Sequence, residues 1–129
     1  MLNPPRYKVL IVEDDAPIRT MYELKLKKTG FIVQSANDGD TGLKKAKDFK
    51  PDIVLLDLRL PTMNGDAMLE KLRQTDWGAD MRVVILTNIS KDEAPQSLRM
   101  LGVDRYIVKA HHTPAQVVDV VQDVLAIKH

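Results

Sequence analysis

The sequence predicts an α/β domain built on a parallel sheet, and two patterns support this prediction. Short runs rich in β-branched residues alternate about five times with segments of helical periodicity, as is typical of β-α-β folds. Three of these runs, 9–12, 53–56 and 83–86, are apolar at consecutive positions. Strands covered by helices on both faces have this composition, whereas half-exposed strands alternate polar and apolar residues. We therefore expect these three strands to lie in the centre of the sheet, and the more polar runs 31–36 and 105–108 to form its edges.

Start and stop signals delimit the helices between these strands. Both 90–93 and 113–116 match a capping box, and the second adds Pro114 at the first helical position. Gly30 and Gly102 lie just past helical patterns, where a residue with left-handed backbone is expected to end a helix. The first helix should begin near Pro17 and bury Ile18, Met21, Tyr22 and Leu26. The last should bury an apolar stripe made of Val117, Val120, Val121, Val124 and Leu125.

Length, charge and composition exclude several classes of protein. The 129 residues are the size of one domain, so we expect a single domain over 1–129 with a flexible tail at 1–5. Nineteen basic and 18 acidic residues give a net charge of +1, which does not indicate direct nucleic-acid binding. The chain has no cysteine, which excludes disulfides and thiolate metal sites. It has neither an apolar stretch of the roughly 20 residues that a membrane span needs nor a signal peptide, so we expect a cytoplasmic protein without membrane contact.

Residues suited to phosphoryl chemistry follow four of the five predicted strands. The first strand is followed by three consecutive acids at 13–15, and the others by Asp57, Thr87 and Lys109. The carboxyl ends of parallel strands line one crevice, which is where ligands bind in open α/β sheets. Each residue also has a simpler interpretation: Asp57 as a helix cap, Asp15 as the cap of the first helix, Lys109 as a salt-bridge partner, and Thr87 as an ordinary strand residue. Three consecutive acids, however, are more than a cap requires.

Carboxylates crowded at one edge favour a bound cation. Two unit charges about 5 Å apart repel by roughly 3 kcal/mol at an effective dielectric constant of 20. A divalent cation would remove this repulsion, and an open site made only of oxygen ligands suits Mg²⁺, or Mn²⁺, better than Zn²⁺. The ammonium of Lys109 could meet an oxygen of a phosphoryl group, and the hydroxyl of Thr87 could donate a hydrogen bond in the same crevice.

Taken together, these motifs resemble the receiver domains of two-component response regulators. The matching segments are Val-Glu-Asp-Asp at 12–15, Leu-Leu-Asp-Leu-Arg-Leu-Pro-Thr-Met-Asn-Gly at 55–65, Leu-Thr-Asn at 86–88 and Tyr-Ile-Val-Lys at 106–109. The resemblance covers about residues 6–127, and its combined spacing is specific. It implies a flavodoxin-like, doubly wound five-stranded parallel sheet of order 2-1-3-4-5, flanked by five helices.

The resemblance also implies a function and a set of roles. Asp57 would accept a phosphoryl group from a phosphohistidine on a sensor histidine kinase or phosphotransfer protein. Glu13, Asp14 and Asp57, with the backbone carbonyl of Arg59, would hold Mg²⁺. Lys109 and Thr87 would bind phosphoryl oxygens, and Tyr106 would be an aromatic switch that turns inward when Thr87 moves. The protein would assist its own phosphorylation and dephosphorylation without being an enzyme for other substrates.

A downstream output protein or domain would read the signal on the face formed by the fourth helix, fifth strand and fifth helix. A phosphorylation-dependent homodimer is a further possibility that the resemblance leaves open. Asn88, like Arg59, flanks the phosphate acceptor and could approach the phosphate.

One position departs from the family pattern, and two other functions compete with this one. Ala110 stands where the family has a proline, often after a cis peptide bond; because a cis bond before a non-proline residue costs about 3 kcal/mol, we expect a trans bond. A degenerate receiver that acts only as an interaction module is the main alternative, although none of the key residues is lost. An aspartyl-phosphate phosphatase would need an Asp-x-Asp motif after the first strand, and Glu13 stands at its first position.

Overall fold

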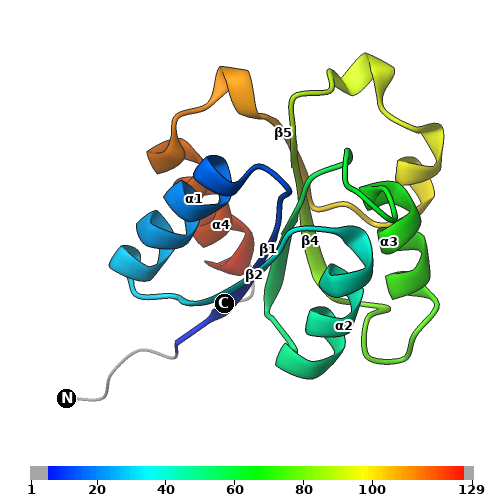
Figure 1. Ribbon diagram of the computed structural model, residues 1–129, viewed down its shortest axis with the longest axis horizontal. Helices are drawn as coiled ribbons and strands as arrows, with labels where there is room; N and C mark the ends of the chain where they lie inside the picture. The colour runs from blue at the N-terminus through cyan, green and yellow to red at the C-terminus, as the bar shows by residue number, and fades with distance from the viewer. Residues whose placement is uncertain (1–5, 127–129) are drawn as a thin grey trace.

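The computed structural model describes residues 6–126 and has a five-stranded parallel sheet of order β2-β1-β3-β4-β5 (Figure 1). The strands are β1 (Lys8–Val12), β2 (Ile32–Ala36), β3 (Ile53–Leu56), β4 (Arg82–Thr87) and β5 (Arg105–Val108). The predicted sheet order and the edge positions of β2 and β5 are confirmed. The tail expected at residues 1–5 lies outside the described residues.

Helices cover both faces of the sheet. Residues of α1 (Ala16–Thr29) and α4 (Pro114–Ala126) share one apolar core with alternate residues of the central strands, including Val9 and Ile11. The intervening strand residues, including Leu10 and Val12, belong to a second core with α2 (Gly39–Phe49) and α3 (Gly65–Arg73). Figure 1 shows the two pairs of helices on opposite sides of the sheet. The consecutive apolar residues of the central strands therefore fill two cores, as the sequence predicted.

Three of the predicted helix signals have the expected geometry. The side chain of Asp15 caps α1 by accepting a hydrogen bond from Ile18 N at 3.1 Å. Gly30 ends the same helix with a φ of 112°, in the left-handed region that glycine adopts without strain. At the start of α4 the capping box is complete, because Thr113 and Gln116 each accept a hydrogen bond from the backbone N–H of the other.

The prediction of five helices is wrong, because the described residues contain four α-helices. Between β4 and β5 the chain forms two short 3₁₀ segments, η1 (Lys91–Glu93) and η2 (Gln96–Met100). The capping box expected at Ser90 is absent, since its side chain makes no cap hydrogen bond. Pro95 explains the break: its ring would collide with the carbonyl of residue 91 in a helix, and it holds Ala94 in an extended conformation with a ψ of 149°.

The predicted buried side of α1 needs one correction. Tyr22 and Leu26 are buried and Ile18 packs against them, but Met21 is 40% exposed. The inward stripe runs through positions i, i+4 and i+8, which leaves Met21 on its flank. Within residues 6–126, no helix combines the length and apolar character needed to cross a membrane.

Candidate functional site

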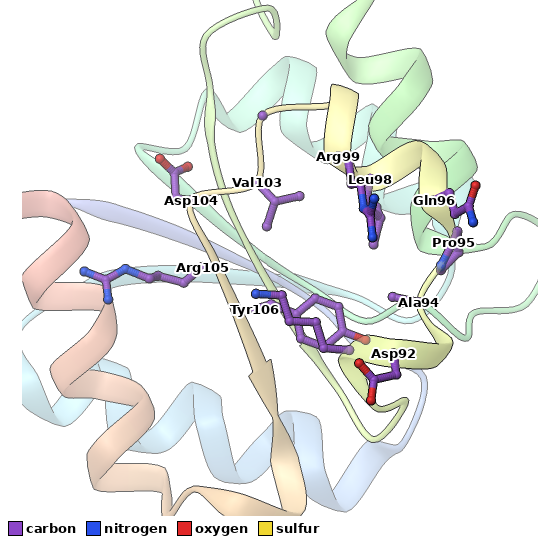
Figure 2. Close-up of a pocket in the computed structure, with 12 residues that line it drawn as sticks. Asp92, Ala94, Pro95, Gln96, Leu98, Arg99, Val103, Asp104, Arg105 and Tyr106 are labelled. Carbon is purple, nitrogen blue, oxygen red and sulfur yellow. The ribbon is translucent and has the colours of Figure 1, made fainter.

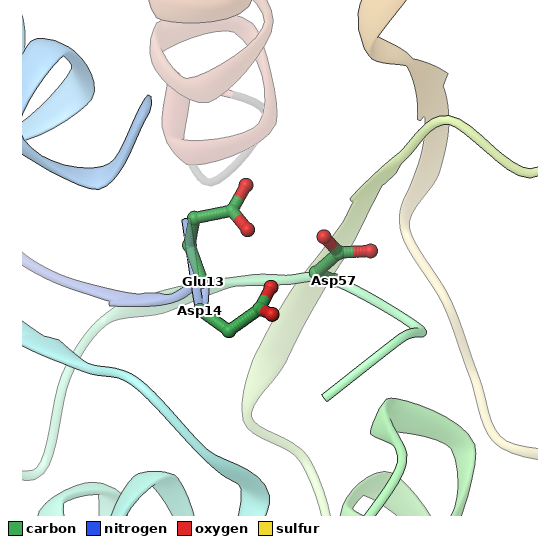
Figure 3. A group of neighbouring side chains, drawn as sticks. All are labelled: Glu13, Asp14 and Asp57. Carbon is green, nitrogen blue, oxygen red and sulfur yellow. The ribbon is translucent and has the colours of Figure 1, made fainter. Parts of the chain in front are cut away.

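Three carboxylates meet at the carboxyl edge of the sheet. Glu13 and Asp14 follow β1, and Asp57 follows β3, so neighbouring strands bring together side chains distant in sequence (Figure 3). One oxygen from each lies within 4.8 Å of the others. Glu13 is 3% exposed and Asp57 7%, whereas Asp14 is open to solvent. The cluster expected from the sequence is therefore present, with one member accessible from outside.

Lys109, the first residue after β5, reaches this cluster and pairs with two of its members. Its Nζ donates to Asp57 Oδ2 at 2.8 Å and to the carboxylate of Glu13. Burial lowers the pKa of Lys109, but the hydrogen bonds and negative charges of Asp57 and Glu13 outweigh this effect and raise the pKa overall. Lys109 is therefore a firmly protonated ammonium that touches the carboxylate of Asp57.

The same environment perturbs Glu13. Burial raises the pKa of Glu13, and the hydrogen bond and charge of Lys109 only partly offset that effect. Three carboxylates face one ammonium, which leaves an excess of negative charge when all the acids are ionised. All these free ligand atoms are oxygens, and Asp14 is open to water. The donor set fits a hard divalent cation such as Mg²⁺ or Mn²⁺, which takes carboxylate ligands and keeps several waters.

The two residues expected to act as a switch lie on β4 and β5. Thr87 ends β4 next to β3 and is 1% exposed, and its Oγ1 accepts a weak hydrogen bond from Ile89 N at 3.4 Å. The hydroxyl of Tyr106 donates to Ile89 O at 2.7 Å, and burial raises its pKa. Tyr106 is thus attached to the loop that follows Thr87. Whether its side chain moves with Thr87 stays a prediction.

A cavity of about 700 Å³ lies next to Tyr106, between β5 and the two 3₁₀ segments. Figure 2 shows Leu98 and Val103 among its apolar lining residues and Asp92 and Arg99 among its charged ones. This is the place at which the sequence predicted a fourth helix. Tyr106 itself lines the cavity, together with residues of η1, η2 and β5.

Comparison with known proteins decides the family. The family model described as the response regulator receiver domain matches residues 9–122. The chain belongs to this family. Receiver domains are signalling domains, and membership gives this chain a role in two-component signalling.

Curated relatives of this receiver domain are longer regulators. The alkaline phosphatase synthesis transcriptional regulatory protein PhoP of Bacillus subtilis (strain 168) is 34% identical over 103 residues, which are 79% of this chain and 42% of PhoP. The phosphate regulon transcriptional regulatory protein PhoB of Escherichia coli (strain K12) is 34% identical over 102 residues, 79% of this chain and 44% of PhoB. The chain thus spans less than half the length of these relatives.

Solved receiver structures have the same fold. The chemotaxis response regulator CheY4 of Vibrio cholerae superposes with a TM-score of 0.85 at 28% identity, covering 93% of this chain and 99% of CheY4. The receiver domain of the sensor histidine kinase PA1611 from Pseudomonas aeruginosa PAO1 gives a TM-score of 0.85 at 23% identity, covering 95% and 99%. That structure has a magnesium ion coordinated in its active site cleft. At this identity it supports the fold of our receiver domain only.

The loop after Asp57 in this receiver domain depends on a glycine that the sequence reasoning did not single out. A Cβ atom on Gly65 would lie 2.1 Å from the backbone oxygen of Asp57, so no other residue fits without moving the backbone at Asp57. The backbone N–H of Arg59 points back to Asp57 Oδ1 at 3.3 Å, whereas the Arg59 side chain is exposed. Gly65 directly follows Asn64, which occupies the N-cap position of α3. This place at the start of a helix is the signal in the sequence that could have identified Gly65.

The start of α2 holds the same loop from the other side. Thr62 has a φ of 64°, which is unusual for a β-branched residue, and its hydroxyl donates to Asp38 Oδ1 at 3.4 Å. A Cβ atom on Gly39 would lie 2.1 Å from Met63 O. Asp38 also caps α2, and the hydrogen bond from Thr41 N lowers the pKa of Asp38. No simple motif in the sequence predicts this contact, because it joins two loops.

The turn after β5 confirms the expected trans peptide. Every peptide bond within residues 6–126 is trans, including the one between Lys109 and Ala110. The backbone N–H of Ala110, which a proline would lack, donates to Asn88 Oδ1 at 3.2 Å. The sequence suggested that Asn88 could approach the phosphate, but its carbonyl oxygen accepts a hydrogen bond from this turn.

Proposed function

We propose that this receiver domain is a phosphorylation-dependent signalling switch whose phosphate acceptor is Asp57. The observation that carries the proposal is the contact between Asp57 and Lys109 inside a cluster of carboxylates at the carboxyl edge of the sheet. Phosphoryl transfer requires charge neutralisation and positioning more than covalent activation. An acceptor carboxylate, a protonated lysine and oxygen ligands for a cation supply both in one place.

The proposed chemistry is the transfer of a phosphoryl group from a phosphohistidine of a sensor histidine kinase or phosphotransfer protein. A carboxylate oxygen of Asp57 attacks the phosphorus, the phosphorus–nitrogen bond breaks, and the electron pair stays on the imidazole. Lys109 then donates to an oxygen of the phosphoryl group, and Thr87 donates to another. Protonated Lys109 thereby stabilises the negative charge that the transfer brings into the site.

Glu13, Asp14 and Asp57, with the backbone carbonyl of Arg59, would hold Mg²⁺ in this proposal, and Mn²⁺ could replace it. Bound there, the metal would neutralise charge on the phosphoryl oxygens and help orient them. Support comes from the carboxylate oxygens that lie within 4.8 Å of one another.

The proposed switch connects Thr87 to the face beside Tyr106. A phosphoryl group can shift the protein only if it binds one arrangement of Thr87 and Tyr106 better than another. Ile89 is hydrogen-bonded to both residues, through its backbone N–H to Thr87 Oγ1 and through its backbone oxygen to the hydroxyl of Tyr106. A movement of Thr87 toward the phosphate would therefore displace Ile89 and, with it, the partner of Tyr106. An output protein or domain, or a second copy of the chain, would read the change on the face formed by η1, η2, β5 and α4.

We assign this phosphorylation and its readout to the cytoplasm, without direct nucleic-acid or membrane binding by this domain.

A nuclear magnetic resonance experiment tests this function. The ¹⁵N-labelled protein is treated with Mg²⁺ and acetyl phosphate, a small phosphate donor. We expect amide signals of residues 87–91 and 105–111 to shift in wild type but not in Asp57→Asn. Mg²⁺ alone serves as the reference spectrum. Identical spectra with and without the donor would contradict the proposal and favour a degenerate receiver that acts as an interaction module.

A further inference from the structure

Two exposed residues that flank the site are joined by a side chain to backbone hydrogen bond. Ala110 N donates to Asn88 Oδ1 at 3.2 Å. Asn88 directly follows Thr87, the last residue of β4, and Ala110 follows Lys109, the first residue after β5. The hydrogen bond therefore links the loop after β4 to the turn after β5. Thr87 and Lys109, the two residues proposed to bind phosphoryl oxygens, lie directly next to the bonded residues.

The turn that carries Lys109 has few other contacts of this kind. The strand pairing between β4 and β5 ends with Thr87 opposite Val108. Beyond that pair, His112 N donates to Lys109 O at 3.3 Å, and His112 Nδ1 lies 3.2 Å from Val108 O. Both of these contacts are internal to the turn, so they do not fix its direction relative to β4. The hydrogen bond from Ala110 N to Asn88 Oδ1, in contrast, connects the backbone of the turn to the residue that follows β4.

We propose that Asn88 is a positioning residue, which holds the turn after β5 so that Lys109 points at Asp57. This inference rests on the proposed role of Asp57 and Lys109. A lysine side chain is long and flexible, so the direction of its backbone decides how much of its time Nζ spends at the acceptor. Because residue 110 is an alanine in a trans peptide and not a proline, its backbone N–H is available to donate the hydrogen bond that Asn88 accepts.

The same bond couples Lys109 to Thr87. The loop after Thr87 is bonded to the β5 side through Asn88, which accepts from Ala110 N, and through the backbone oxygens of Ile89 and Ser90, which accept from the hydroxyl of Tyr106. A movement of Thr87 toward a phosphoryl group would carry Asn88 with it and would reach the turn that holds Lys109. The two residues that bind phosphoryl oxygens would thus move together rather than independently.

Three substitutions separate this role from a merely structural one. Asn88→Leu keeps the approximate size but removes the acceptor, Asn88→Asp keeps an acceptor, and Ala110→Pro removes the donor. Because Asn88 and Ala110 are exposed, we expect all three variants to fold, and a melting curve checks this.

The first readout needs no phosphorylation and is taken on metal-free protein. It consists of the hydrogen-exchange rate of the Ala110 amide and the chemical shift of the Lys109 ammonium signal. Asn88→Leu should speed the exchange about two- to tenfold, the range for losing one net hydrogen bond, and move the Lys109 signal toward that of exposed lysines. Asn88→Asp should leave both near wild type.

The second readout is the rate of phosphorylation by acetyl phosphate at saturating Mg²⁺, with the dissociation constant of Mg²⁺ measured separately. Asn88→Leu should slow phosphorylation about two- to tenfold. It should change the Mg²⁺ constant by less than about twofold, because the hydrogen-bond partner of Asn88 is Ala110 and not a carboxylate. In the Ala110→Pro background the same substitution should have no effect on the rate.

The outcomes are distinguishable from those that bear on the proposed function. An unchanged Lys109 signal in Asn88→Leu overturns the positioning role, and so does an equal rate effect with and without Ala110→Pro. Failure of wild type to take up any phosphate would refute the proposed function. In that case the Lys109 and Ala110 signals alone would decide whether Asn88 positions the lysine.

Discussion

At the scale of single residues, Lys109 controls the charge balance of the metal-free site. Its side chain is 10% exposed and contacts both Glu13 and Asp57. The two carboxylates are themselves buried, so water cannot replace the ammonium easily. Removing one partner of a buried ion pair leaves an uncompensated charge, which costs more than the pair contributes when intact.

We therefore expect Lys109→Met to lower the free energy of unfolding in metal-free buffer by about 3 kcal/mol. Mg²⁺ should restore more stability to this variant than to wild type, because it takes over the neutralisation of Glu13 and Asp57. Urea unfolding with EDTA and with Mg²⁺ measures both effects. Lys71→Met, at an exposed position on α3, is the control and should change neither value. Equal stability of Lys109→Met and wild type in EDTA would contradict this prediction.

Asp57→Asn should have the opposite effect on the metal-free protein. The substitution removes one of three crowded carboxylates and leaves Lys109 paired with Glu13. The free energy of unfolding in EDTA should be at least that of wild type, and the melting temperature should rise less on adding Mg²⁺. A clear loss of metal-free stability would show that the contact between Lys109 and Asp57 outweighs the repulsion among the acids.

At the scale of the elements, the start of α2 carries a charge-dependent contribution to stability. The pKa of Asp38 lies below its ordinary value of 3.8, chiefly because its carboxylate accepts a hydrogen bond from Thr41 N. An acid with a lowered folded pKa stabilises the protein above its unfolded pKa and loses that contribution as the pH falls through the folded pKa. Its effect should be complete at neutral pH and disappear below 3.8.

The matched variant is Asp38→Asn, which keeps a capping side chain without the charge. Wild type should be more stable than this variant at pH 7, and the difference should shrink steadily as the pH falls below 3.8. Chemical unfolding of both proteins across this range measures the difference. A difference that stays constant with pH would exclude the charge of Asp38 as its cause.

Pro95 should be the residue that prevents a helix between β4 and β5. Replacing it with alanine restores the backbone N–H and removes the collision with the carbonyl of residue 91, so the segment from Lys91 to Met100 should become helical. Far-UV circular dichroism and backbone chemical shifts would detect the added helix. Pro114→Ala, at the first position of α4, is the control and should add none. An unchanged spectrum for Pro95→Ala would mean that packing around Leu98 determines the conformation.

The elements differ in how well their sequence predicted them, for physical reasons. The apolar runs of β1, β3 and β4 predicted the centre of the sheet, because burial on both faces leaves a strong compositional pattern. Ser90 and Glu93 carried a valid capping signal, but Pro95 stands inside the helix that they would have started. The contact between Asn88 and Ala110 left no local pattern, since it depends on how two loops approach each other in space.

At the scale of the whole molecule, the site exists only when the sheet is assembled. Glu13 follows β1, Asp57 follows β3 and Lys109 follows β5, and the latter two are 52 residues apart in the chain. The parallel order of the strands brings their carboxyl ends to one edge, which the sequence predicted. It did not predict that Lys109 would bridge two acids, because that requires side-chain geometry.

The central claim is that this edge of the sheet makes Asp57 a phosphate acceptor. Tandem mass spectrometry after reaction with acetyl phosphate, with and without Mg²⁺, tests it most directly. We predict one added phosphoryl group per chain, located on Asp57, present only with Mg²⁺ and absent in Asp57→Asn. Wild type that gains no phosphoryl group with Mg²⁺, or that gains one at a different residue, would contradict the claim.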